Sequence, residues 1–122
     1  MSVIAIIPAF NEEKTIGGVL QTLKEVDIIS KTIVVSDGST DDTVKIAQSY
    51  NVDIIEFKDN KGKGAALKAG IEKAEGEVIL FLDADLVGLK EEHIHSLVLP
   101  VLHGETDMTI GIFDKGRITT DL

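Results

Sequence analysis

The sequence predicts an α/β domain built around a mainly parallel β-sheet with helices on both faces. Two observations support this fold class. Short β-branched apolar runs alternate along the chain with segments of helical periodicity, and the best of these runs lack the polar alternation of a strand that has one solvent-facing side. Strands that are apolar on both sides need helices above and below the sheet. A chain of 122 residues is long enough for one such domain.

The first half of the chain is expected to supply three strands and two helices. Runs rich in Ile and Val predict strands at residues 3–7, 32–35 and 52–57. A helix at 14–26 follows from apolar residues at helical spacing, namely Ile16, Val19, Leu20 and Leu23. A short helix at 44–50 follows the capping-rich run Ser39-Thr40-Asp41-Asp42.

The second half continues the alternation of helix and strand. A helix is expected at 65–74, and its small residues would let it lie close to a sheet: Ala66, Ala69, Gly70 and Ala74. The most apolar strand is predicted at 77–82. A helix at 91–102 is expected to be disturbed at Pro100, and a fifth strand is expected at 108–112.

Residues 113–122 show no pattern of an element that would close the sheet. An uncovered sheet edge usually pairs with more chain or with a partner. We therefore expect the chain to be the truncated N-terminal part of a larger protein, or to form a homodimer that covers the open edge.

Composition excludes several classes of function. The chain has 12 basic and 21 acidic residues, a net charge of −9, which argues against a nucleic-acid or anionic-membrane surface. The absence of Cys excludes disulfides, thiolate zinc sites and a cysteine nucleophile. No apolar run approaches the roughly 20 residues of a transmembrane segment, and the N-terminus lacks a basic leader. We therefore expect a cytoplasmic location.

Polar residues cluster directly after four of the expected strands. In open α/β sheets, ligands bind at the carboxyl ends of the parallel strands, so these groups are expected to converge on one site. The four clusters are Pro8-Ala9-Phe10-Asn11-Glu12, Ser36-Asp37-Gly38-Ser39, Lys58-Asp59-Asn60-Lys61-Gly62-Lys63-Gly64 and Asp83-Ala84-Asp85.

The two carboxylates of Asp83-Ala84-Asp85 can share a divalent cation, or hold one cation and one sugar hydroxyl. Oxygen ligands of this kind suit magnesium or manganese. Two carboxylates in one loop repel each other unless a cation neutralises them. The alternative interpretation is a solvated turn that carries two surface aspartates.

The other clusters also allow two interpretations. Asp37 either accepts a hydrogen bond from a base N–H or a ribose hydroxyl, or forms a turn with Gly38. Glu12 is either a ligand contact or a first-turn helix carboxylate. The loop at 61–64 opens a helix and either attracts phosphate through Lys63 and its backbone or is a flexible basic turn. This loop has neither a Walker spacing nor a dinucleotide fingerprint.

Two further groups of residues are candidates for binding a metal or an anion. His93 and His95 point to different faces of a helix and His103 follows it, so capping or solvation is favoured over a zinc site. Arg117 is the only arginine, and together with Thr119 it either binds a phosphate or carboxylate bidentately or belongs to a mobile tail.

Taken together, four motifs resemble the nucleotide-sugar half of the family 2 glycosyltransferases, which have a GT-A fold. They are Ile6-Ile7-Pro8-Ala9-Phe10-Asn11-Glu12-Glu13, Val34-Val35-Ser36-Asp37-Gly38-Ser39-Thr40-Asp41, Gly62-Lys63-Gly64-Ala65-Ala66 and Phe81-Leu82-Asp83-Ala84-Asp85-Leu86. They occur in the family's order and spacing and cover most of the chain. Gly116-Arg117-Ile118-Thr119 is similar to the acceptor-phosphate segment of glucosyl-3-phosphoglycerate synthases. Dolichol-phosphate mannosyltransferase-like enzymes commonly carry an Arg shortly after the fifth strand's Gly, whereas Ile112-Phe113 follows Gly111 here.

The resemblance implies a role for each matched position. Pro8, Phe10 and Glu12 would border the base and ribose, and Val35 and Asp37 would contact the base. Lys63 would approach the diphosphate. Asp83, Ala84 and Asp85 would form the DxD motif, with Asp83 toward the ribose or sugar and Asp85 on the metal. Arg117 and Thr119 would contact the acceptor.

The implied function is that of a metal-dependent glycosyltransferase, with magnesium or manganese as cofactor and a UDP- or GDP-linked sugar as donor. Residues 1–122 would be its donor-binding half, and the acceptor half with the catalytic base would be absent. A non-catalytic nucleotide-sugar-binding or assembly module that needs a partner is the alternative. A sugar nucleotidyltransferase is less favoured because a Gly-rich, Arg-containing loop is missing after the first strand.

Overall fold

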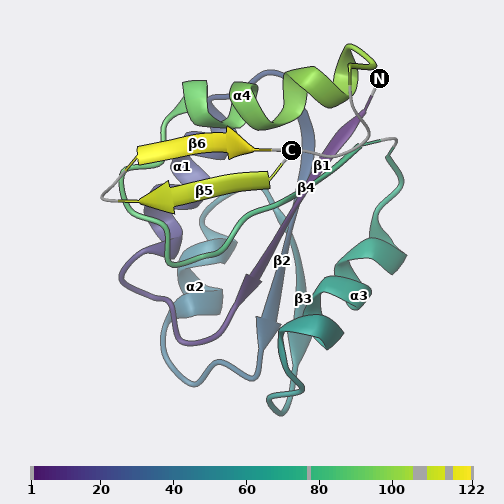
Figure 1. The fold of residues 1–122 in the computed structure, drawn as a ribbon. Coiled ribbons are helices and arrows are strands. Elements are labelled where there is room, and N and C mark those ends of the chain that lie inside the picture. Colours follow the sequence, from purple (N-terminus) through teal and green to yellow (C-terminus); the bar gives the residue numbers. More distant parts are fainter. Residues whose placement is uncertain (1, 77, 106–109, 115–116, 122) are drawn as a thin grey trace.

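The computed structural model describes residues 2–76, 78–105, 110–114 and 117–121 (Figure 1). Strands and helices alternate through most of the chain, as the sequence predicts. In order, the elements are β1 (Val3–Ala9), α1 (Ile16–Lys24), β2 (Ile29–Asp37), α2 (Thr43–Gln48), β3 (Asp53–Phe57), α3 (Lys63–Lys73), β4 (Val78–Phe81), α4 (Glu91–Leu102), β5 (Ile110–Asp114) and β6 (Arg117–Asp121).

Four strands form a parallel sheet in the order β3-β2-β1-β4. β1 is central, and its Ile6 pairs with Ile33 of β2 on one side and with Phe81 of β4 on the other. The chain adds β2 and β3 on one side of β1 and then crosses to place β4 on the other. This reversal creates a crevice between the ends of β1 and β4, the place where open α/β sheets bind ligands.

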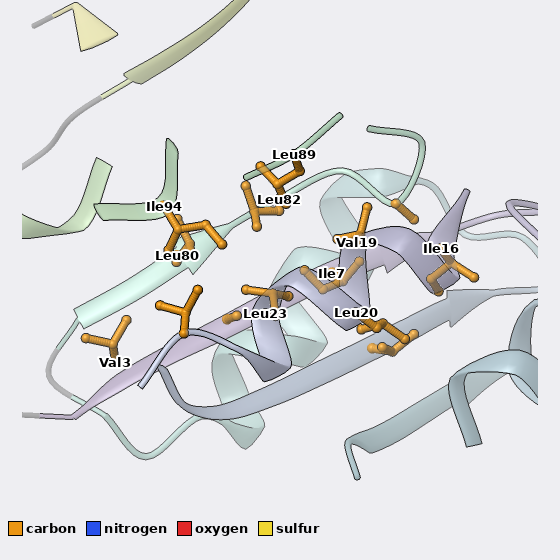
Figure 2. Close-up of a cluster of buried hydrophobic side chains, with 14 of the residues drawn as sticks. Val3, Ile7, Ile16, Val19, Leu20, Leu23, Leu80, Leu82, Leu89 and Ile94 are labelled. Atoms are coloured by element: carbon orange, nitrogen blue, oxygen red, sulfur yellow. The ribbon is translucent and has the colours of Figure 1, made fainter. Parts of the chain in front are cut away.

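The two faces of β1 pack against different helices, which confirms the prediction of helices on both faces. Val3, Ala5, Ile7 and Ala9 belong to the larger core cluster, together with apolar residues of α1 and α4. Figure 2 shows this cluster, in which Ile7 and Leu80 of the sheet lie among Val19, Leu23 and Ile94 of the helices. Because side chains alternate along a strand, Ile4 and Ile6 face the opposite side.

The helix α3 covers this second face and lies very close to the sheet. Ala66 is fully buried against Ile4 and Ile6. A Cβ placed on Gly70 would come within 2.5 Å of the Ile6 Cγ2 atom. The predicted face of small residues therefore has the expected consequence, a close approach of helix and strand.

The C-terminal strands differ from the expectation. β5 pairs antiparallel with β6 in a separate two-stranded sheet, and β6 contacts α4 (Figure 1). The sequence analysis did not identify the strand β6 within residues 113–122, but neither β5 nor β6 joins the parallel sheet, so the expectation that this segment does not close that sheet is confirmed. A short strand that pairs only with its neighbour needs no continuous apolar run, which was the pattern used to find the other strands.

Several elements begin or end at other residues than the sequence predicts. β2 extends the predicted 32–35 at both ends, and α1 starts at Ile16 rather than at Lys14. The helix α4 has the predicted bounds and continues through Pro100. Parts of three ranges used in the sequence analysis lie outside the described residues, namely 77, 108–109, 115–116 and 122.

Candidate active site

A cleft of about 390 Å³ opens at the carboxyl ends of the parallel strands. Residues at the carboxyl ends of all four strands contribute to it, so the predicted convergence of the strand-end clusters is confirmed. Its lining residues are Pro8, Ala9, Phe10, Glu12, Asp37, Asn60, Gly62, Lys63, Ala66, Asp83, Ala84 and Asp85.

Among the residues predicted to bind the nucleotide-sugar, Val35 is the one that does not line the cleft. Its side chain is fully buried in the smaller core cluster with Ile33 and Ala66, beneath α3. The contact with a base that the resemblance implies for Val35 stays a prediction, and the burial of the side chain leaves only its backbone available for such a contact. Val35 lies two residues before Asp37, so both side chains leave the same face of β2, but only Asp37 reaches beyond the packed core.

Asp37 joins the end of β2 to the loop after β3. Its Oδ1 atom accepts the backbone N–H of Lys61 at 2.6 Å, and its Oδ2 atom accepts that of Gly62 at 2.9 Å. The neighbouring Gly38 has a φ of +77°, and a Cβ there would lie 2.6 Å from the Asn60 backbone nitrogen. Asp37 therefore has a structural role in this loop, and its predicted contact with a ligand stays a prediction. Each carboxylate oxygen keeps a second lone pair for a ligand.

Asn11 joins the loop after β1 to the loop after β2. It adopts a φ of 51°, a conformation that Asn tolerates better than most residues. Its Oδ1 atom accepts the Thr40 N–H at 2.8 Å, and its own N–H donates to Ser39 Oγ at 3.1 Å. The Glu12 N–H donates to Thr43 Oγ1 at 2.9 Å. These bonds hold Glu12 at the rim of the cleft.

Lys63 and Asp83 form an ion pair across the cleft, with the Lys63 Nζ atom 2.5 Å from Asp83 Oδ1. Lys63 is the first residue of α3, and Gly62 before it has a φ of 97°. The N-terminus of α3 therefore opens on the cleft, as the phosphate interpretation of this loop requires.

Ala84 separates the two aspartates of the loop after β4. Its side chain is buried in the larger core, while Asp83 and Asp85 on either side are exposed and line the cleft. The Ala84 carbonyl oxygen accepts the Thr15 hydroxyl at 2.8 Å. Alternating inward and outward side chains direct both carboxylates toward the same space.

The charge of the cleft is strongly negative. Its lining carries the carboxylates of Glu12, Asp37, Asp83 and Asp85 against the single ammonium of Lys63. Burial raises the pKa of Glu12 above its ordinary value, and the negative charges of Asp85, Asp41 and Asp83 raise it further. Glu12 therefore interacts electrostatically with the aspartate pair although it comes from a different loop.

This donor set suits a hard divalent cation that brings part of its own coordination shell. Carboxylate oxygens are preferred ligands of magnesium and manganese. Among the described residues, no three His, Asp or Glu side chains are grouped closely enough to hold a metal by themselves. A metal at Asp85 would therefore complete its shell with water and with oxygens of a bound ligand.

Asn60 lines the cleft, although the sequence analysis assigned it no role. Its position within the loop rich in glycine and lysine was the sequence feature that could have pointed to it. His93 Nδ1 accepts the Lys90 N–H at 3.0 Å, which confirms a capping role. Arg117 and Thr119 lie in β6, and their side chains are outside the described part, so their acceptor role stays a prediction.

A crevice at the switch point of a parallel sheet, with an acidic pair on one side and a helix N-terminus on another, is typical of nucleotide-binding α/β proteins. The chain belongs to the family described as Glycosyl transferase family 2, whose model matches residues 4–122. The family resemblance inferred from the motifs is thereby confirmed.

Curated relatives agree with this family. The chain is 38% identical over 102 residues to a 4,4'-diaponeurosporenoate glycosyltransferase of Staphylococcus aureus strain bovine RF122 / ET3-1, a match that covers 80% of this chain and 27% of the relative. The same enzyme from strain USA300 is 39% identical over 98 residues, with coverages of 76% and 26%. The chain thus spans about a quarter of the length of these relatives.

Solved structures show the same GT-A fold. Glucosyl-3-phosphoglycerate synthase from Mycobacterium tuberculosis in complex with UDP has a TM-score of 0.83 at 30% identity, covering 95% of this chain and 45% of that one. The same enzyme with Mn²⁺, UDP and glucosyl-3-phosphoglycerate has a TM-score of 0.78 at 31% identity, covering 85% and 40%. S. aureus TarS has a TM-score of 0.75 at 28% identity, covering 88% and 34%.

Within the part of the chain that the structure describes, no helix has the length and apolarity to cross a bilayer. The cytoplasmic location and the homodimer stay predictions.

Proposed function

We propose that residues 1–122 form the donor-binding half of a metal-dependent glycosyltransferase that uses a nucleotide-diphosphate sugar. The observation that carries this proposal is the cleft itself. It brings together the Asp83 and Asp85 carboxylates, Glu12 and the Lys63 ammonium at the N-terminus of α3. Membership of the glycosyl transferase family supports the same reaction class.

Each side of the cleft suits a different part of the donor. The exposed ring of Phe10 and the ring of Pro8 offer apolar surface for a base and ribose, with Asp37 as an acceptor for polar hydrogens. Lys63 and the first turn of α3 suit the diphosphate. The Asp83 carboxylate can accept a hydrogen bond from a ribose or sugar hydroxyl once Lys63 turns to the phosphates.

Asp85 is the proposed metal ligand, with Glu12 and Asp83 contributing negative charge nearby. When bound, a magnesium or manganese ion would stabilise the negative charge that develops on the departing diphosphate. The residues of the chain hold and orient the donor. The catalytic base and most of the acceptor site would come from outside this donor half, apart from the contribution predicted for Arg117 and Thr119.

Calorimetric titration of the purified protein with UDP, in Mn²⁺ and in EDTA, tests this function. UDP is the first probe because the glucosyl-3-phosphoglycerate synthase structures contain it. We expect binding that depends on Mn²⁺, and GDP tests the second candidate base. A folded protein that binds neither nucleotide in Mn²⁺ contradicts the proposal. Metal-dependent binding without sugar transfer by the full-length protein supports the alternative, a non-catalytic binding module.

A further inference from the structure

Thr15 connects two loops of the cleft without lining it. Its hydroxyl donates to the Ala84 carbonyl oxygen at 2.8 Å, and its backbone N–H donates to the Glu12 carbonyl oxygen at 3.2 Å. Ala84 is the residue between Asp83 and Asp85. Thr15 therefore ties the loop that carries Glu12 to the backbone between the two aspartates.

The hydroxyl of Thr15 does not make the hydrogen bond that is common at its position in the chain. Thr15 is the N-cap residue of α1, a position where a threonine hydroxyl commonly accepts a backbone N–H of the first helical turn. Its side chain makes no such capping bond. The hydroxyl points instead to a carbonyl that lies 69 positions later in the sequence.

We propose that Thr15 is a positioning residue for the Asp83-Ala84-Asp85 loop, an inference that rests on the proposed function of this cleft. A fixed Ala84 carbonyl sets the orientation of the peptide plane between Ala84 and Asp85. The buried Ala84 side chain holds the same residue from the core side. With both fixed, the backbone position from which the Asp85 side chain starts is held, which restricts where its carboxylate can lie relative to Glu12.

Thr22 provides a matched control on the same helix. Its hydroxyl also donates to a carbonyl of the segment between β4 and α4, that of Leu89, at 3.0 Å. It lies 3.1 Å from the Gly18 carbonyl oxygen as well. Valine at either threonine removes one hydroxyl and keeps the side-chain shape, but only Thr15 contacts the residue between the aspartates.

The test compares Thr15→Val, Thr15→Ser and Thr22→Val by calorimetry with UDP in Mn²⁺ and in EDTA, together with thermal unfolding. Loss of a residue that orients a metal ligand typically weakens metal affinity by about tenfold or more, and we expect that loss of Mn²⁺-dependent UDP affinity for Thr15→Val. Thr15→Ser keeps the hydroxyl and should bind as the wild type does. UDP binding in EDTA should not change, and Thr22→Val should lose stability without losing the metal dependence.

The outcomes separate this inference from the proposed function. A wild-type protein without Mn²⁺-dependent UDP binding overturns both. Normal Mn²⁺ dependence in Thr15→Val, or equal losses in Thr15→Val and Thr22→Val, overturns the positioning role alone. If Thr15→Val does not fold, Thr15→Ala takes its place as the variant without the hydroxyl: weakened Mn²⁺ dependence in a folded alanine variant, with wild-type behaviour in Thr15→Ser, supports the proposal, and normal Mn²⁺ dependence in Thr15→Ala overturns it.

Discussion

Asp37 accepts the backbone N–H of Gly62 at 2.9 Å, so the last residue of β2 holds the turn from which α3 begins. A second bond, from the Lys61 N–H at 2.6 Å, engages the other carboxylate oxygen. These two bonds therefore fix the carboxyl end of β2 and the start of α3 relative to each other before any ligand binds. Both bonds are charge-assisted, which makes them stronger than bonds between neutral groups.

Asp37→Ala is expected to lower the free energy of unfolding by about 2 kcal/mol, because two backbone N–H groups lose an ionised acceptor. Urea denaturation measures the change. Asp59→Ala removes an exposed carboxylate from the same loop and should change stability by less than about 0.5 kcal/mol. Equal losses in the two variants would show that the hydrogen bonds of Asp37 contribute little.

Two helix glycines should respond to alanine with opposite signs. Gly18 of α1 has nothing within 4 Å of an added Cβ, so Gly18→Ala should raise stability by about 0.5–1 kcal/mol through the lower entropy of the unfolded chain. At Gly70 the same Cβ meets Ile6 at 2.5 Å. Gly70→Ala should therefore cost about 1 kcal/mol or more, because Ile6 must move within a packed core. Stabilisation by both substitutions in thermal unfolding would mean that α3 moves away from the sheet easily.

The raised pKa of Glu12 predicts a pH-dependent effect on stability. Folding favours the protonated form of Glu12, since burial and then Asp85, Asp41 and Asp83 disfavour its charge. This group's favourable contribution is complete below its ordinary value of 4.5 and is lost as the pH rises through its folded-state pKa. In EDTA at neutral pH, Glu12→Gln should therefore be more stable than the wild type, by less than about 1 kcal/mol for this half-exposed group.

Urea denaturation at several pH values checks this prediction. The stabilisation by Glu12→Gln should disappear well below pH 4.5, where the wild-type carboxyl is protonated. Glu72→Gln, on the exposed side of α3, controls for the general benefit of reducing a net charge of −9. A gain as large for Glu72→Gln would attribute the effect to net charge rather than to the cleft.

Asp85→Asn should weaken Mn²⁺-dependent UDP binding by more than tenfold, about 1.4 kcal/mol or above, because an amide is a poorer ligand of a hard cation than a carboxylate. Calorimetry with and without EDTA provides the measurement. Asp27→Asn, which removes an exposed carboxylate outside the cleft, should leave the dissociation constant unchanged. An unchanged constant for Asp85→Asn would remove Asp85 from the metal shell.

The sequence predicted the parallel sheet and the convergence of its loops because both depend on simple regularities. A strand buried on both faces shows a continuous apolar run, and parallel strands all end at one edge of their sheet. These regularities brought Pro8, Asp37, Lys63 and Asp83 together correctly. The resemblance to glycosyltransferases came from the family motifs, because hydrophobic periodicity alone does not identify a family.

The remaining features depend on contacts between distant segments. Thr15 was expected inside the helix predicted at 14–26, yet α1 starts at Ile16 and the Thr15 hydroxyl bonds to the Ala84 carbonyl oxygen. Val35 lies in a motif that suggests ligand contact, but the alternation along β2 turns its side chain under α3. β6 was missed because Arg117-Ile118-Thr119-Thr120-Asp121 has no continuous apolar run and pairs only with β5.

The strand β1 contributes both to the hydrophobic cores and to the cleft, which limits the substitutions that it can accept. Its odd-numbered side chains fill one core, Ile4 and Ile6 fill the other, and its last residues run directly into the wall of the cleft. A substitution that loosens this strand must therefore disturb ligand recognition and folding together. If the proposed function holds, variation in the donor is thus expected to arise in the connecting loops, where side chains can be exchanged while the interior stays intact.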